Sequence, residues 1–109
     1  MVLRTWTATT KGDREEQYLR TVREQVLPHL ANVPGYLGAF FSRRPVGDDW
    51  EYLVISCWES MDAVRALAGA DPDRAYVPPE IQATLDRWDA SVDNLDVVIA
   101  HETDRLCVG

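Results

Sequence analysis

Two aromatic residues of this chain have the types and positions best suited to chemistry on a small molecule. Trp58 ends the alternating segment WEYLVISCW, and Tyr76 precedes Val77-Pro78-Pro79. A tryptophan at the end of a strand that faces a helix provides a wall for a small-molecule pocket, and a tyrosine on a mobile lid donates a hydrogen bond to a substrate oxygen. The alternative for Trp58 is a role in the core, because a buried tryptophan removes roughly 150–250 Å² of surface from water. Tyr76 has the same alternative of simple packing.

Polar side chains on two strand-like segments complete the candidate pocket. Side chains alternate between the two faces of a strand, so segments 2–9 and 50–58 each present one set of residues to any covering helices. The sets that we expect in the pocket are Leu3, Thr5 and Thr7, and Tyr52, Val54, Ser56 and Trp58. Such a pocket is apolar, with two threonines, one serine and one tryptophan. The threonines also have an ordinary explanation, because threonine is common in strands.

The histidines, cysteines and carboxylates show no spacing typical of a metal site. Cys57 and Cys107 form neither a disulfide framework nor a C-x-x-C pattern, and Cys57 is best interpreted as a small buried hydrophobe. His29 and His101 are expected at the surface, with a role as general base as the alternative. The carboxylates that suit a solvated loop are Asp71, Asp73 and Glu80. We therefore expect no metal ion.

Length and charge exclude several classes of protein. The 109 residues, 46% hydrophobic and 27% charged, predict one domain over residues 1–109 with at most one site per subunit. A formal charge of -7 without clustered Lys or Arg disfavours nucleic acid and anionic membrane surfaces as partners. No apolar segment approaches a membrane span, and the first residues lack the layout of a signal peptide, so we expect a cytoplasmic protein.

The remaining pattern predicts the order β-α-β-β-α-β. Strands are expected at 2–9, 36–46, 50–58 and 94–101, helices at 13–32 and 61–68, a further turn at 71–76, and weak helical character at 80–88. Pro28 predicts a kink or an early end of the first helix near Leu27. Ser60 and Gly69 predict the two ends of the second helix, and Gly38 predicts a bulge or a close approach in the second strand.

This order indicates an α+β, ferredoxin-like fold, with an antiparallel four-stranded sheet covered by both helices on one face. The other face of the sheet is bare in a monomer. We expect it to present Trp6 from the first strand and Leu53, Ile55 and Cys57 from the third. Burial of these side chains predicts a homodimer formed through the sheet face.

Three short motifs carry a resemblance to a known family. Segments 33–39 (VPGYLGA), 58–60 (WES) and 69–72 (GADP), in this order and spacing, resemble the antibiotic biosynthesis monooxygenase superfamily, the dimeric α/β barrel proteins. The resemblance covers about residues 2 to 101. It implies a dimer with one pocket per subunit, between the sheet and the helices. That superfamily includes cofactor-free oxygenases of aromatic polyketides, heme-degrading enzymes and proteins without known activity.

The resemblance to the cofactor-free oxygenases gives Trp58 a place in the pocket, since the tryptophan of their W-E-S motif lines it. Three other polar positions of their pattern carry different residues here. An asparagine is replaced by Val54, a tyrosine by Val64 and, on an ungapped count, an arginine by Pro78. The catalytic candidates are therefore Trp58 and Tyr76, and the expected pocket residues are Thr5, Thr7, Val54, Ser56, Val64, Leu67 and Arg74.

The heme-degrading branch matches less well. The positions of its asparagine, its tryptophan and its heme-ligating histidine fall here on Thr5, Leu67 and Val77. We therefore expect no heme ligation of that kind, and no cofactor.

The resulting hypothesis is a cofactor-independent monooxygenase that uses molecular oxygen on a small aromatic or polyketide-like molecule. Such a protein needs to bind an electron-rich substrate, deprotonate it and hold the anion in a dry cavity. Two alternatives stay open. One is a non-catalytic small-molecule-binding dimer, and the other is a cyclase or isomerase that works without oxygen.

Overall fold

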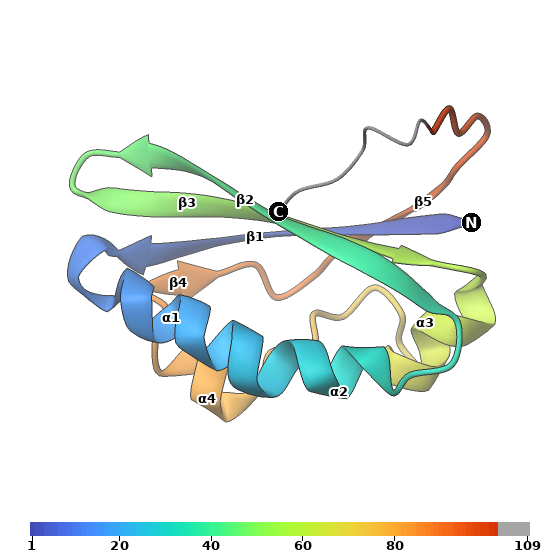
Figure 1. Ribbon diagram of the computed structural model, residues 1–109, viewed down its shortest axis with the longest axis horizontal. Helices are drawn as coiled ribbons and strands as arrows, with labels where there is room; N and C mark the ends of the chain where they lie inside the picture. The colour runs from blue at the N-terminus through green and yellow to red at the C-terminus, as the bar shows by residue number, and fades with distance from the viewer. Residues whose placement is uncertain (103–109) are drawn as a thin grey trace.

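Three long antiparallel strands form the centre of the sheet in the computed structural model, which describes residues 1–102. They are β1 (Val2–Lys11), β2 (Tyr36–Val46) and β3 (Asp49–Trp58). The order is β2-β3-β1, and two short strands, β4 (Arg87–Trp88) and β5 (Asp93–Asp96), pair with the free edge of β1. All helices cover one face of this sheet (Figure 1). The ferredoxin-like α+β arrangement expected from the sequence is confirmed.

The first helical segment is continuous past Pro28. It runs through a 3-10 turn, η1 (Gly12–Arg14), then α1 (Glu15–Thr21), a π-helical stretch, η2 (Val22–Val26), and α2 (Leu27–Ala31). The N–H of Leu27 donates to the carbonyl of Val22, five residues back, immediately before the proline. The prediction of an early end is therefore wrong. The wider π-helical turn before Pro28 accommodates this residue, which has no N–H to donate, without breaking the helix.

The turns and the second helix follow their local signals. Helix α3 (Met61–Ala68) begins where the Ser60 hydroxyl accepts a hydrogen bond of 3.3 Å from the Ala63 N–H, and it ends at Gly69 with φ 81°. The register of β2 and β3 shifts between Tyr36 and Gly38, which confirms the bulge. Gly47, with φ 60°, opens the two-residue turn of the hairpin. These elements are specified by neighbouring residues alone, so the sequence predicts them well.

The segment after residue 70 differs from expectation. Residues 80–88 form only α4 (Pro79–Gln82) and then β4, and the last strand is Asp93–Asp96 rather than 94–101. The reason is pairing with β1, because the Asp86 and Asp89 N–H groups donate to the carbonyls of Thr9 and Thr7 at 2.8 and 3.0 Å. Cys107 lies outside the described residues.

The two faces of β1 are the reverse of those predicted. Trp6 is paired with Val54, and both line a cavity on the helix side of the sheet. Thr5 and Thr7 are paired with Ile55 and Leu53 on the outer face. The prediction that Trp6 lies on the bare face is therefore wrong. Arg4, on the strand face that carries Trp6, is 5% exposed, so this face is the buried one.

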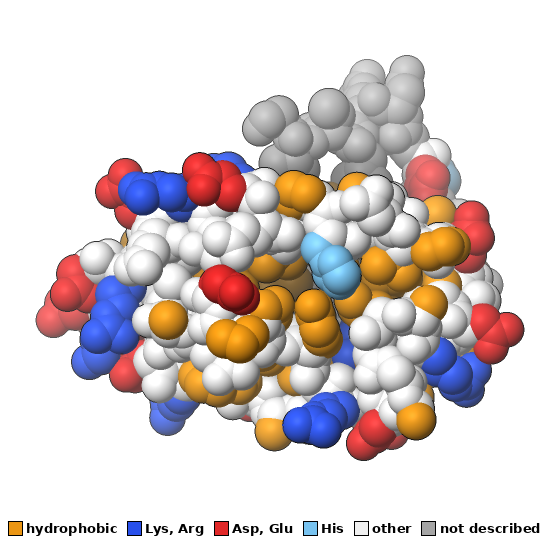
Figure 2. All heavy atoms as spheres, turned by 90° about the horizontal axis from the view of Figure 1, so that it is seen from below, with side chains coloured by type: hydrophobic (Ala, Val, Ile, Leu, Met, Phe, Trp, Pro, Cys, Tyr) orange, Lys and Arg blue, Asp and Glu red, His pale blue; other side chains and the backbone are white. Residues whose placement is uncertain are grey.

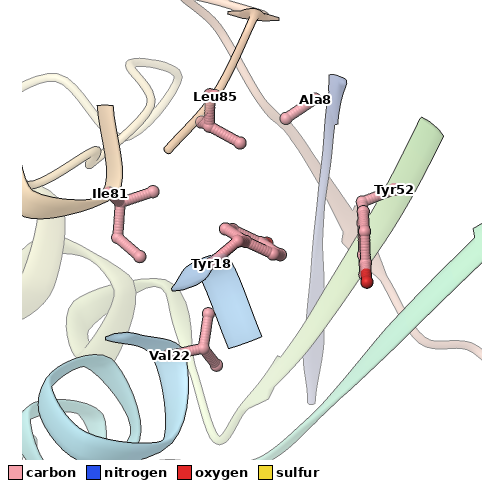
Figure 3. Close-up of a cluster of buried hydrophobic side chains, with 6 residues drawn as sticks. All are labelled: Ala8, Tyr18, Val22, Tyr52, Ile81 and Leu85. Atoms are coloured by element: carbon pink, nitrogen blue, oxygen red, sulfur yellow. The ribbon is translucent and has the colours of Figure 1, made fainter. Parts of the chain in front are cut away.

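Two clusters of buried side chains fill the space between sheet and helices. The first consists of Ala8, Tyr18, Val22, Tyr52, Ile81 and Leu85 (Figure 3). The second consists of Val2, Leu30, Trp58, Ala63 and Val64. Between the clusters the packing is incomplete, and the candidate site lies there. Among residues 1–102, no helix has the length and apolar character needed to cross a membrane.

Candidate active site

An apolar cavity of about 90 Å³ lies between the helices and the inner face of the sheet. Its walls come from β1, β2, β3, the first helical segment, α3 and the segment 76–81. On the helical face, hydrophobic side chains gather around a hollow (Figure 2). The aromatic members of the wall are Trp6, Tyr18, Phe41 and Tyr76. Such a cavity is mostly apolar and presents flat ring surfaces, as a site for a small aromatic molecule requires.

Arg4 supplies the only cation of the cavity wall among the described residues. Its Nη1 donates to the Pro72 carbonyl and, at 3.2 Å, to Asn94 Oδ1, and its Nη2 donates to the Arg74 carbonyl at 2.6 Å. In residues 1–102 no carboxylate oxygen forms a salt bridge with it. The guanidinium is thus held by neutral acceptors, with no carboxylate of residues 1–102 at salt-bridge distance.

The position of Arg4 follows from the sheet register. It is the cross-strand partner of Ser56 on β3 and of Asn94 on β5. The Asn94 amide also donates to the Pro72 carbonyl at 2.9 Å and to Asp73 Oδ1 at 3.2 Å. Burial lowers the pKa of Arg4 and Asp73 partly opposes this. The side chain remains charged at neutral pH, because a guanidinium loses its proton only in strongly basic solution.

Ser56 lies in the cavity wall beside Arg4, and Trp58 lies behind it. The Trp58 Nε1–H donates to Ser56 Oγ at 2.8 Å. Trp58 is 0% exposed and packs edge-on against Tyr36, with ring centroids 5.3 Å apart. Because the serine oxygen accepts this bond, its own O–H is free to donate elsewhere. Trp58 therefore acts on the cavity through Ser56 and does not line it.

The mouth of the cavity is formed by an aromatic pair. Tyr76, which is 47% exposed, stacks on His29, with centroids 5.7 Å apart and planes inclined by 26°. An outer depression of about 170 Å³ lies beside this pair, and Glu80 also lines it. The depression shares Val26, Tyr76, Pro78 and Ile81 with the inner cavity. The two hollows are therefore adjacent, and Tyr76 stands between them.

The inner cavity contains no evident base. Burial, followed by the neighbouring Tyr52, raises the pKa of Tyr18 well above its usual range, so this phenol stays neutral. No aspartate, glutamate or histidine of residues 1–102 lines the inner cavity. His29 and Glu80 reach only the outer depression.

The structure brings together four of the nine residues expected at the site: Val54, Ser56, Leu67 and Tyr76 line the cavity. Trp58 and Val64 lie behind it, in the second buried cluster. Thr5 and Thr7 lie across the sheet, and Arg74 contributes its carbonyl to Arg4.

Sequence reasoning missed Arg4 together with Trp6 and Tyr18. The available signal was an alternating set, Val2, Arg4, Trp6 and Ala8, whose only polar member is the arginine. One charge on an otherwise apolar strand face is a sign of a buried functional side chain, because such burial is rare without partners.

Comparison with family models assigns the chain. Residues 1–78 match the model of the family described as antibiotic biosynthesis monooxygenase. The chain belongs to this family. A search of curated proteins gives no match to it. The family contains cofactor-independent oxygenases and heme degraders, so membership leaves the substrate open.

Solved structures with the same fold include both kinds of protein. A monooxygenase from the gene ActVA-Orf6 of Streptomyces coelicolor, in complex with nanaomycin D, has a TM-score of 0.63 and 20% identity over 93% of this chain and 92% of its own. The heme degrader MhuD from Mycobacterium tuberculosis, with two hemes in its active site, has a TM-score of 0.59 and 22% identity over 94% of this chain and 100% of its own. SnoaB, a cofactor-independent oxygenase from Streptomyces nogalater, has a TM-score of 0.53 and 18% identity over 95% of this chain and 97% of its own. At these identities the similarity shows the fold.

The residues of the cavity do not fit a heme. The cavity volume of about 90 Å³ is well below the roughly 300–1,000 Å³ of drug-sized ligand pockets. Its wall offers no histidine, cysteine or methionine among residues 1–102 as an axial ligand. Leu67 and Val77, where the resemblance would place a tryptophan and the ligating histidine, line the cavity with apolar side chains. The residues that line this cavity therefore do not support a heme cofactor.

Proposed function

We propose that this family member is a cofactor-independent monooxygenase of a small, electron-rich hydroxyaromatic molecule. The observation that carries the proposal is the inner cavity, which combines apolar and aromatic walls with a single buried cation, Arg4. Family membership supports oxygen chemistry. The cavity supports a flat substrate that is anionic when it reacts, because an apolar site with one cation favours a bound negative charge.

The reaction needs no reductant beyond the substrate. The anion of a hydroxyaromatic transfers one electron to O₂, and the resulting radical pair combines to form a carbon–oxygen bond. The peroxide anion takes up one proton from solvent, equal to the one lost when the substrate ionised. The hydroperoxide then loses water and leaves a carbonyl. A ring CH₂ or a phenol CH is oxidised, one oxygen atom of O₂ enters the product as C=O, and the other leaves as H₂O. The protein binds the substrate, holds the anion and excludes water.

Size limits the substrate. An engineered cavity of about 150 Å³ holds a benzene ring, and the inner cavity is smaller, at about 90 Å³. Even a single-ring substrate must therefore extend past Tyr76 into the outer depression of about 170 Å³, or Tyr76 must move outward. Tyr76 is 47% exposed and stacks on the exposed residue His29, so this movement displaces a side chain that is already half in solvent.

Oxygen uptake tests the proposal. Purified protein is incubated with hydroxylated anthrones and naphthols in an oxygen electrode, and products are analysed by mass spectrometry under ¹⁸O₂. We expect protein-dependent uptake and one labelled oxygen per product. Val54→Phe, which fills the cavity, should abolish the activity, whereas Val46→Phe at the exposed end of β2 should retain it. Turnover without oxygen would indicate a cyclase or isomerase, and binding without turnover would indicate a binding protein.

The outer face of the sheet supports a homodimer as part of this proposal. Phe40, Leu53 and Leu95 are each 43–50% exposed, and Leu3, Ile55 and Cys57 lie on the same face. A second copy of the chain would cover these apolar side chains. Light scattering at low micromolar concentration should give twice the chain mass of 12.3 kDa. A clean monomer would exclude this arrangement.

A further inference from the structure

We propose that Arg4 and Ser56 form an oxyanion site, oriented by Trp58, and that the substrate binds there as a phenolate. This inference rests on the proposed function, since it specifies the substrate class of the same cavity. It assigns recognition of the ionised oxygen to residues that neither the composition nor the family motifs of this chain indicate.

The first argument is the unused hydrogen-bonding capacity of Arg4. A guanidinium has five N–H groups, and the described residues accept three hydrogen bonds from it, at the Pro72 and Arg74 carbonyls and at Asn94 Oδ1. The Nε–H and one N–H of Nη2 are left. No side-chain nitrogen or oxygen of residues 1–102 that is shut off from solvent lacks a partner, so the unpaired Nε is not fully enclosed by the protein. A fixed guanidinium with free donors at an apolar cavity is suited to bind an anionic oxygen.

The second argument is charge. The acceptors that fix Arg4 are two carbonyls and an amide, all neutral. The nearest carboxylate that acts on its pKa is Asp73, whose Oδ1 accepts instead from the Asn94 amide at 3.2 Å. The positive charge is therefore only partly offset by Asp73 and can attract an anionic ligand. One cation without a carboxylate in the cavity wall matches one negative charge, so the preferred ligand is a monoanion.

The third argument is the orientation of Ser56. Its Cα is the direct cross-strand partner of Arg4, and both side chains line the same cavity. Opposite side chains on adjacent strands have Cβ atoms about 4.5–5.5 Å apart, a spacing at which both can reach one oxygen atom. The Trp58 Nε1–H occupies an acceptor position on Ser56 Oγ at 2.8 Å. The serine proton is thereby directed away from Trp58 and is free to donate to the ligand.

The absence of a base in the inner cavity of the described chain then has a chemical explanation. The titratable groups that face the site are Arg4, Tyr18 and Tyr76, with Asp73 behind Arg4 and with His29 and Glu80 at the mouth. Arg4 carries its proton as a cation, and burial raises the pKa of the Tyr18 phenol, so neither group acts as a base. A phenol that binds with its oxygen at Arg4 is made more acidic by the guanidinium and releases its proton to solvent through the mouth. The substrate thus enters its reactive form by binding.

A chromogenic phenol tests this directly on the wild-type protein. 4-Nitrophenol changes colour on ionisation and is too electron-poor to react with O₂, and 4-nitroanisole has nearly the same shape but cannot ionise. The two compounds are titrated under argon between pH 5 and 8, with absorbance and calorimetry as readouts. We expect bound 4-nitrophenol to show the phenolate band at a pH at least one unit below that of the free compound. We also expect it to bind at least about tenfold more tightly than 4-nitroanisole, the factor that corresponds to one pKa unit.

Variants assign the effect to the two residues. Arg4→Met should remove the phenolate band while 4-nitroanisole still binds, and Arg44→Met at the exposed end of β2 is the matched control. Because Arg4 also holds the loop carbonyls, Arg4→Met is checked for folding by circular dichroism. Ser56→Ala keeps the contacts between Arg4 and the loop carbonyls. It should weaken phenolate binding about tenfold, because it removes one hydrogen bond to a charged group. The matched control Ser42→Ala changes an exposed serine of β2 and should leave phenolate binding unchanged.

Each outcome is decisive. Bound 4-nitrophenol that stays neutral overturns the inference, as does equal affinity for the two compounds or no binding of either. Phenolate binding that survives in both Arg4→Met and Ser56→Ala also overturns it. Benzoate, which is ionised throughout this pH range, distinguishes a carboxylate site from a phenolate site. Tighter binding of benzoate than of 4-nitrophenol at pH 8 would assign the site to carboxylates and overturn the inference that it binds a phenolate. Phenolate binding without oxygen uptake from any hydroxyaromatic would refute the proposed function and leave the oxyanion site standing.

Discussion

The hydrogen bond between Trp58 and Ser56 gives a quantitative test of how the site is built. Ser56→Ala removes the acceptor and leaves the buried Nε1–H of Trp58 unpaired, which costs about 1–3 kcal/mol. Trp58→Phe leaves Ser56 Oγ without its donor, but this oxygen lies in the wall of a partly open cavity and can bind water. Trp58→Phe should lower the free energy of unfolding by about 1–2 kcal/mol, mainly through lost packing. Complete removal of a large aromatic side chain costs roughly 3–5 kcal/mol, and this substitution removes only part of the ring system.

The double variant with both Ser56→Ala and Trp58→Phe has no buried indole N–H left unpaired. The effects of the two substitutions on stability are therefore coupled. We expect the double variant to be more stable than the sum of the single changes predicts, by about 1 kcal/mol. The assay is equilibrium unfolding in urea followed by far-ultraviolet circular dichroism, since fluorescence would change with the loss of Trp58. The m-values of the four proteins should agree, which shows that the unfolded states are comparable. Additivity within about 0.3 kcal/mol would refute the proposal that Trp58 orients Ser56.

Three further predictions concern other parts of the chain. Ligand-induced quenching of tryptophan fluorescence should be lost in Trp6→Phe and retained in Trp58→Phe, because Trp6 lines the cavity and Trp58 lies behind it; the reverse result would return Trp58 to the pocket wall. Gly35→Ala should lower the free energy of unfolding by about 2–4 kcal/mol, because φ is 87° and the added Cβ would lie 2.5 Å from Ala63 Cβ. The control Gly47→Ala, with φ 60° and open space, should cost about 1–2 kcal/mol, and equal urea midpoints for the two would contradict this. Burial raises the pKa of Glu15, but hydrogen bonds from Arg43 and Tyr52 outweigh it and leave the pKa lowered. The unfolded chain therefore binds this proton more readily, so Glu15 stabilises the fold above the usual carboxyl range and the contribution is lost as pH falls through its lowered pKa. Glu15→Gln should flatten the acid limb of the stability curve measured in urea, and an unchanged limb would show that the contact does not contribute.

The success of the sequence reasoning depends on where the determining contacts lie. Helix α3 was predicted because Ser60 and Gly69 act on backbone groups within four residues of themselves. The end of the chain was mispredicted because β4 exists through its pairing with β1, almost 80 residues earlier in the sequence. Alternation separated the two faces of β1 correctly, but it gave no information on which face is buried. That choice depends on acceptors for Arg4 supplied by Pro72, Arg74 and Asn94, which no local pattern reveals.

The contacts of Arg4 also connect the oxyanion site to the mouth of the cavity. The carbonyls that it holds belong to Pro72 and Arg74, just before Tyr76 in the chain. The bridge between Arg74 and Ser91 and the hydrogen bond from the Ala75 N–H to the Ala90 carbonyl, at 2.9 Å, fix the same segment from its other side. Tyr76 therefore stands on a backbone that is anchored by the residue proposed to bind the substrate oxygen. An anion at the free N–H groups of Arg4 would leave these anchoring bonds intact, because they use different donors. The guanidinium, with five N–H groups in one plane, can serve both purposes at once. A lysine, with a single ammonium group, cannot hold two carbonyls and an amide in this geometry and still present donors to a ligand.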